Sequence, residues 1–153
     1  MDPSLAARAE LDAVRLRRAE LREALDHLER ALAAPATGRA VIWGEAVHAS
    51  AIELADDFSA HVEATEGPSG LHNAILAGDL RLTNAVVALT GEHQEIAAEI
   101  AALVSDSAAP VTAGDVDGVR ERGTRLLGHL VRHRQRGADL IFEAYQTDIG
   151  GGD

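Results

Sequence analysis

Apolar residues recur at alternating spacings of three and four positions along four long stretches of the chain. This period predicts helices that each bury one face. The first stretch starts at Asp2-Pro3, where Asp2 is predicted to cap the helix and Pro3 to occupy its first position, and it ends before Pro35. The third stretch is the most regular, and its stripe consists of Leu82, Val86, Leu89, His93, Ile96, Ile100 and Leu103.

Glycine and proline separate these stretches. The predicted breaks are a turn over 34–39, a stop over 67–70 and a loop over 105–114. They leave a second long helix over 39–65, a short extra helix over 71–77 and a fourth long helix that ends near 145–148. No stretch alternates apolar and polar residues with the period of two that a half-buried strand requires.

Short connections between long helices place consecutive helices antiparallel to one another. The sequence therefore predicts an all-α protein, an antiparallel up-down-up-down four-helix bundle in which residues 1–149 form a single domain. Residues 150–153 are mostly glycine and are predicted to form a flexible tail. At 153 residues the chain is long enough to bury a core without crosslinks.

The composition narrows the chemistry. The chain has no cysteine, so a metal would have to be held by imidazole or carboxylate groups. The formal charge of −11 repels phosphate, which disfavours nucleic acid as a partner. No apolar stretch approaches the roughly 20 residues of a membrane span, and no signal-peptide pattern opens the chain, so we expect a cytoplasmic protein without a membrane partner.

Three of the seven histidines stand on the predicted core stripes. His61 lies on the second long helix, His93 on the third and His133 on the fourth. A single histidine in a core stripe is usually a neutral residue, hydrogen-bonded to a neighbouring helix or to a buried water. One histidine on each of three helices instead favours a metal site, because helix bundles build such sites from inward-facing side chains.

The segments around these histidines are His61-Val-Glu-Ala-Thr-Glu66, Glu92-His93 and His133-Arg-Gln-Arg-Gly-Ala-Asp139-Leu-Ile-Phe-Glu143. They resemble the hemerythrin-like proteins, also called HHE cation-binding domains, over about residues 40–148. The resemblance implies a four-helix bundle with a non-haem di-iron centre, held by histidines and bridging carboxylates. It also implies a function in dioxygen or nitric oxide binding, redox sensing or iron handling.

Carried over position by position, the resemblance assigns His61, His93 and His133 as metal ligands. It adds Glu66 as the carboxylate that follows the first of them, whereas Gly137-Ala138 stands where the family has a carboxylate on the last helix. Three histidines and one carboxylate would leave two iron ions strongly positive in a poorly solvating core. A single ion held by the histidines, with Glu66 or water, is simpler. We expect one or two non-haem iron ions and no organic cofactor.

The alternative hypothesis is a metal-free helical interaction module, in which the same histidines are structural or belong to a degenerate site. An apolar outer face would then support binding to a partner or a homodimer. The missing carboxylate after His133 motivates this alternative. The sequence holds no Ser-His-Asp arrangement and no carboxylate pair suited to hydrolysis, so an enzyme is less expected.

Counting residues from the predicted turns gives the heights of the histidines along the helices. It places His93 and His133 some turns apart, and it opposes His61 to the region of Leu11 and Val14 on the first helix, where no histidine is present. The count therefore brings only part of the proposed ligand set to one level.

Two groups of arginines receive structural interpretations. The arginines at 132, 134 and 136 are predicted to form a solvated flank that pairs with acids such as Glu29 or Asp56, with contact to an anionic ligand as the alternative. Arg18 interrupts the first apolar stripe and is predicted to extend towards solvent or to pair with a buried carboxylate.

Overall fold

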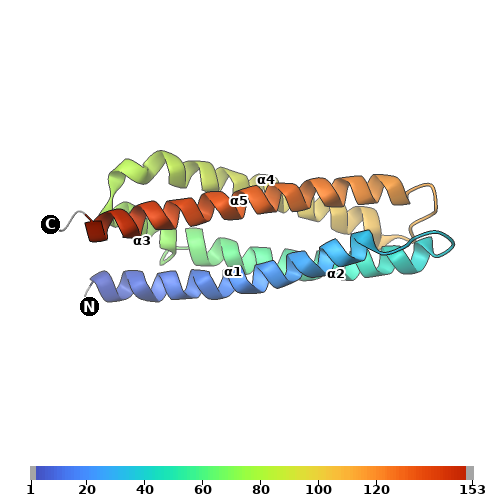
Figure 1. Ribbon diagram of the computed structural model, residues 1–153, viewed down its shortest axis with the longest axis horizontal. Coiled ribbons are helices and arrows are strands. Elements are labelled where there is room, and N and C mark those ends of the chain that lie inside the picture. Colours follow the sequence, from blue (N-terminus) through green and yellow to red (C-terminus); the bar gives the residue numbers. More distant parts are fainter. Residues whose placement is uncertain (1–2, 151–153) are drawn as a thin grey trace.

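The computed structural model describes residues 3–150, and within this range the chain is helical without a strand. The four long helices are α1 (Pro3–Ala33), α2 (Ala40–Glu66), α4 (Thr83–Ala108) and α5 (Val116–Gly150). A short helix, α3 (Leu71–Gly78), and a 3-10 turn, η1 (Leu80–Leu82), connect α2 to α4. The long helices run along the length of the molecule, and the α1–α2 and α4–α5 connections lie at the end opposite the termini (Figure 1). The predicted all-α class is confirmed.

The helix boundaries agree with the predicted breaks except near the ends of α4 and α5. The loop predicted from residue 105 is wrong at its start, because α4 continues to Ala108. There the buried Ser107 hydroxyl donates a hydrogen bond to the Leu103 carbonyl at 2.7 Å, in the manner of a helical residue. Helix α5 reaches Gly150, beyond its predicted end. The predicted cap at Asp2 and the tail after Gly150 lie outside the described residues.

The turn between α1 and α2 depends on Gly38. Its φ of +72° lies in the left-handed region, which a residue without a β-carbon adopts at no steric cost. The turn reverses the chain within a few residues and allows α2 to pack directly along α1 (Figure 1).

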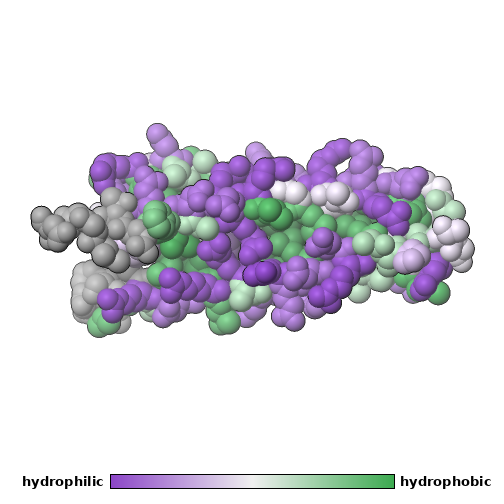
Figure 2. Space-filling model, viewed as in Figure 1, coloured by the Kyte–Doolittle hydropathy of each residue, from purple (hydrophilic) through white to green (hydrophobic). Residues whose placement is uncertain are grey.

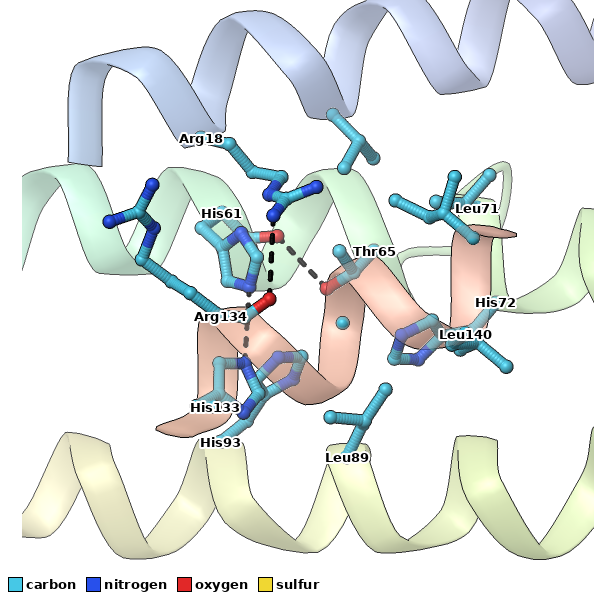
Figure 3. Close-up of a pocket in the computed structure, with 13 residues that line it drawn as sticks. Arg18, His61, Thr65, Leu71, His72, Leu89, His93, His133, Arg134 and Leu140 are labelled. Atoms are coloured by element: carbon cyan, nitrogen blue, oxygen red, sulfur yellow. Dashed lines mark hydrogen bonds between the residues drawn. The ribbon is translucent and has the colours of Figure 1, made fainter. Parts of the chain in front are cut away.

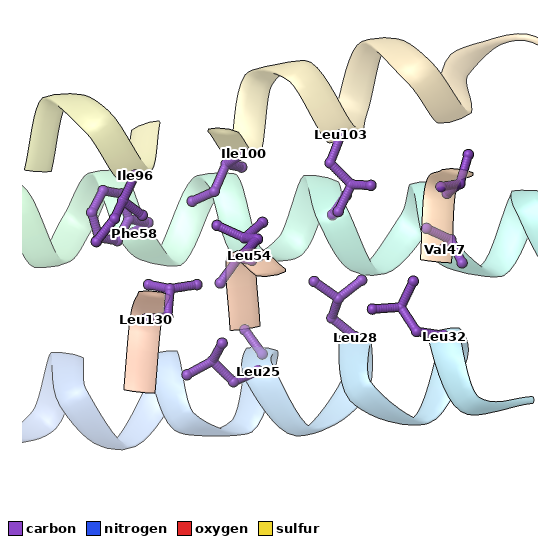
Figure 4. Close-up of a cluster of buried hydrophobic side chains, with 14 of the residues drawn as sticks. Leu25, Leu28, Leu32, Val47, Leu54, Phe58, Ile96, Ile100, Leu103 and Leu130 are labelled. Atoms are coloured by element: carbon purple, nitrogen blue, oxygen red, sulfur yellow. The ribbon is translucent and has the colours of Figure 1, made fainter. Parts of the chain in front are cut away.

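Buried apolar side chains form two separate clusters. The connection-side cluster fills the half of the molecule near the interhelical connections (Figure 4). Its members include Leu21, Leu25, Leu28, Leu32, Trp43, Val47, Leu54, Phe58, Ile96, Ile100, Leu103, Leu126 and Leu130. The terminal-side cluster consists of Leu11, Val14, Leu71, Ile75, Leu82, Val86, Leu89, Leu140 and Ala144. The hydrophobic core is therefore interrupted part of the way along the helices.

Hydrophilic residues cover most of the molecular face in Figure 2, and hydrophobic residues gather along its middle. Within residues 3–150, no single helix is long and apolar enough to cross a membrane. The segments Ala40–Gly78 and Leu80–Ala108 meet the length and composition criteria only as a pair, which is bent by 115°.

The approach of the α4–α5 connection to α2 predicts an effect on stability at Gly44. A β-carbon there would lie 2.5 Å from Val111 Cγ2 and 2.7 Å from Val111 Cβ. We expect Gly44→Ala to lower the free energy of unfolding by about 1–3 kcal/mol, because this overpacking outweighs the helix propensity of alanine. Gly91→Ala is the matched control, since its β-carbon would have no neighbour within 4 Å. Urea unfolding should show that the control is neutral or stabilised; equal effects would contradict the packing argument.

Candidate metal centre

A layer of histidines separates the two apolar clusters. His61 on α2, His93 on α4 and His133 on α5 are all buried, with exposed fractions of 6%, 2% and 3%. Each lies three residues along its helix from a member of the connection-side cluster; these members are Phe58, Ile96 and Leu130. The spacing places each histidine on the core face of its helix, as the apolar period predicted.

One ring nitrogen from each histidine lies within 4.8 Å of one ring nitrogen of the others. The Nε2 atoms of His61 and His133 are 3.4 Å apart. Two imidazole ligands on one tetrahedral ion, with bonds of about 2.0–2.1 Å, have their nitrogens roughly 3.3–3.4 Å apart. His61 and His133 are therefore at the spacing of two ligands on one ion, and all three histidines lie close enough together that they could hold a metal ion.

His93 and His133 lie at the same level, with ring centroids 4.8 Å apart. The helix count that put them some turns apart was wrong, because it started the α4–α5 connection too early. With α4 extended to Ala108 and α5 starting at Val116, the two histidines are at similar distances from this connection. The residue count that opposed His61 to Leu11 and Val14 of α1 was nearly right, because Val14 and Arg18 line the cavity beside His61.

Two carboxylates lie beside the Nδ1 atoms of His93 and His133, which are called the outer nitrogens below. Glu66 Oε2 lies 2.8 Å from His93 Nδ1, and Glu92 Oε2 lies 2.6 Å from His133 Nδ1. A carboxylate accepts the Nδ1–H proton of a neutral imidazole, and this leaves the lone pair on Nε2 for a metal. Metal-binding histidines commonly have such a carboxylate partner, so this arrangement fits a metal site.

Glu66 and the arginines of α5 take different positions from those expected. Glu66 supports the outer nitrogen of His93 and is not among the grouped ligand atoms, which come from histidines alone. Arg136 makes its ion pair with Glu92 rather than with Glu29 or Asp56. Burial alone would raise the pKa of Glu92, but the hydrogen bonds from His133 and Arg136 outweigh it and hold this pKa below its usual value.

A buried ring nitrogen without a hydrogen-bond partner gives a second argument for a metal. His93 Nε2 has no such partner among the described residues, whereas its Nδ1 is held by Glu66. His61 Nδ1 is also without a partner there, but the nitrogen that His61 turns towards His133 is Nε2. Buried polar atoms in native proteins are almost always satisfied, so each exception calls for a ligand, an ion or a water. The histidines therefore do not form a self-contained hydrogen-bonded core cluster.

The electrostatics of the layer favour neutral imidazoles. Burial, followed by repulsion from His93 and His133, lowers the pKa of His61 to about 3. Burial also lowers the pKa of His133, although its hydrogen bond to Glu92 opposes the shift. Metal ions bind the neutral form of histidine, so the rings of His61 and His133 are ready for coordination at neutral pH without loss of a proton.

A cavity of about 30 Å³ adjoins the histidines on the terminal side (Figure 3). Its walls are mainly apolar and include Leu71, Leu89, Leu140, Ile141 and Gly137. This space corresponds to about two water-sized positions. A metal at the histidines would therefore have room on one side for a small ligand.

His72 is a fourth histidine at the cavity, and it was not among the residues predicted for the site. It lies on α3, and its ring stacks on that of His93 with an interplanar angle of 4° and a centroid separation of 5.8 Å. Its Nδ1 is 3.3 Å from Thr90 Oγ1. Burial, with repulsion from His93, lowers the pKa of His72 to about 4. The signal available was its place beside Leu71 on the apolar face of the short helix.

The carboxylate behind His133 makes a testable contribution to metal affinity. We expect Glu92→Gln to weaken metal binding by about 10–100-fold, the usual effect of losing such a partner. The same change at Glu95 is the matched control, because Glu95 lies one turn away on α4, is largely exposed and pairs with His129 at 3.8 Å. Competition with a metal chelator would measure both affinities. Equal affinities would show that Glu92 does not support a ligand.

Comparison of the chain with protein-family models, with curated proteins and with solved structures gives no match. The resemblance to the hemerythrin-like family therefore rests on the sequence segments alone and stays a prediction.

Proposed function

We propose that this protein is an antiparallel four-helix bundle that binds one non-haem metal ion through His61, His93 and His133. Iron is the ion that we favour. The observation that carries the proposal is the convergence of three buried imidazoles, two of which have carboxylate partners on their outer nitrogens. Nitrogen ligands of this kind suit iron, zinc, copper and nickel. The resemblance to hemerythrin-like proteins favours iron among these.

A single ion fits the site better than a pair. Two ions would require further anionic ligands, and no carboxylate belongs to the group of ligand atoms within the described part of the chain. Glu66 and Glu92 lie behind the rings, where they offset the charge of one divalent ion without bonding to it.

The cavity beside the histidines supports the binding of a small ligand as the role of the metal. Three protein ligands leave a coordination position of the ion for an exogenous group. The volume of about 30 Å³ limits this group to a molecule of a few atoms. Dioxygen and nitric oxide, the ligands that the resemblance suggests, are of this size. Iron storage would require more space than the cavity offers.

Metal analysis tests this proposal. Protein purified without a histidine tag and loaded with Fe(II) under anaerobic conditions should retain about one iron per chain after desalting. Its absorption spectrum should change when nitric oxide is added. Retention of less than about a tenth of an ion per chain, for iron and for zinc alike, would overturn the proposal.

The metal-free interaction module remains the second candidate. The exposed apolar residues Val41 and Ile52 line a groove of about 300 Å³ between α2 and the end of α4, and a partner could bind there. The module does not, however, account for the unpartnered nitrogens of His61 and His93. If the protein retains no metal and forms a concentration-dependent dimer, this second function is favoured.

A further inference from the structure

Arg18 brings a positive charge to the cavity that the metal site itself does not require. Its side chain extends from α1 over His61, and its Nη2 donates a hydrogen bond to the Arg134 carbonyl at 3.3 Å (Figure 3). It is half-buried, and within residues 3–150 no carboxylate lies at ion-pair distance from it, so the predicted pairing of Arg18 with a buried carboxylate is wrong. Burial, with repulsion from Arg134 and Arg15, lowers the pKa of Arg18, as expected for a cation without an anionic partner.

The few polar side chains in the mainly apolar lining of the cavity include no acidic group among the described residues. They include Arg18 and Arg134 together with four histidines. This selection is unexpected in a chain with a formal charge of −11. A partly buried guanidinium is costly to desolvate unless an anion compensates it.

The free space is lined both by Arg18 and by the three histidines, so an anion there could contact the guanidinium and a metal ion. Gly137 is one helical turn after His133, on the same face of α5, and it lines the cavity. A β-carbon at this position would meet no atom within 4 Å. The absence of a side chain thus leaves a space between the histidines and the wall of the cavity. A volume of about 30 Å³ accommodates an anion of only a few atoms.

We propose that this cavity binds a small monovalent anion, such as formate or nitrite, held between Arg18 and the metal ion at His61, His93 and His133. The inference rests on the proposed function, because the metal supplies the second positive contact. The inference specifies the class of ligand that the site takes, because the negative charge of the ligand, and not its size alone, then decides which molecule binds. A guanidinium binds a planar carboxylate or nitrite group through charge-assisted hydrogen bonds, which are stronger than those to a neutral molecule.

A titration of the metal-loaded protein tests the inference. Co(II) loaded into the site provides visible absorption that reports on its coordination, and formate is added at constant pH and ionic strength. We expect saturable binding of formate, and binding at least about tenfold weaker for formamide, its neutral counterpart of similar shape. Arg18→Gln should weaken formate binding about tenfold or more. Arg17→Gln, which removes a charge that pairs with Glu20 on the surface, should change it by less than about twofold.

The outcomes separate the two proposals. Normal Co(II) loading with formate affinity equal in the wild type and Arg18→Gln would overturn the anion site and leave the metal site standing. Equal affinities for formate and formamide would do the same. A protein that takes up no Co(II), Fe(II) or Zn(II) would overturn both.

Discussion

Replacing His133 with alanine should lower the affinity for the metal by on the order of a hundredfold or more. Each ligand of a four-coordinate site contributes a large share of the binding free energy, and a site with two histidines keeps neither the geometry nor the strength of one with three. The buried Glu92 carboxylate would also lose its histidine partner. Isothermal titration with Zn(II) and competition with a chelator would measure the change.

His129→Ala is the matched control for this substitution. His129 lies one turn before His133 on α5, and its ring contacts Glu99 and Glu95 outside the histidine layer. The control should bind the metal with an affinity within a few-fold of that of the wild type, because it removes an imidazole that is not a ligand. If both variants lost affinity equally, the metal would bind elsewhere on the surface and the buried layer would not be the site.

The metal-free protein should lose stability as the pH falls from 7 to 5. The pKa of His61 is about 3 in the folded protein and close to 6.5 in the unfolded chain. Between these values the unfolded state binds a proton that the folded state does not, so the free energy of unfolding decreases as the pH is lowered. His61 alone should account for roughly 2 kcal/mol of this loss between pH 7 and pH 5.

His72 adds to the same slope, because burial lowers its pKa to about 4. Urea unfolding of the metal-free protein at several pH values would measure the effect. His61→Leu removes one titrating group and should flatten the curve, although its absolute stability also reflects the new packing. A free energy of unfolding that is constant from pH 7 to pH 5 would contradict the burial of neutral imidazoles. Bound metal should steepen the dependence, since protons compete with it for the same nitrogens.

The core positions of the three histidines could be predicted from the sequence because the helical period alone places them. His61, His93 and His133 each occupy a core position of a long amphipathic helix, and adjacent long helices turn their core faces towards one another. Their common height could not be fixed, since it depends on where the α4–α5 connection begins, and helix ends are the weakest part of a prediction from pattern. The helical continuation through Ser107 decides this height.

The roles of the carboxylates were harder to predict. Glu92 precedes His93 in the sequence, but neighbouring residues on a helix point in different directions, and Glu92 faces His133 on α5 instead. Glu66 was assigned as a ligand through the family resemblance, whereas it reaches the outer nitrogen of His93 from the last residue of α2. Such contacts depend on the rotation and offset of packed helices, which a periodic pattern leaves open.

His72 and Arg18 lay beyond sequence reasoning for different reasons. His72 belongs to a short helix whose position over the cavity depends on the 67–70 break and on packing against α1 and α4. Arg18 stands in an apolar stripe, and a long cationic side chain there usually reaches water. Only the three-dimensional arrangement shows that it extends over His61 and that no carboxylate of the described chain meets it.

X-ray absorption spectroscopy of the loaded protein tests the central claim most directly. For protein carrying one Zn(II) or Fe(II) per chain, we predict scattering from three imidazole rings, with metal–nitrogen distances of about 2.0–2.2 Å, and no second metal. Addition of formate should alter the remaining ligand and leave the three imidazoles in place. A first shell dominated by carboxylate oxygens, with one imidazole or none, would contradict the assignment of His61, His93 and His133 as the metal ligands.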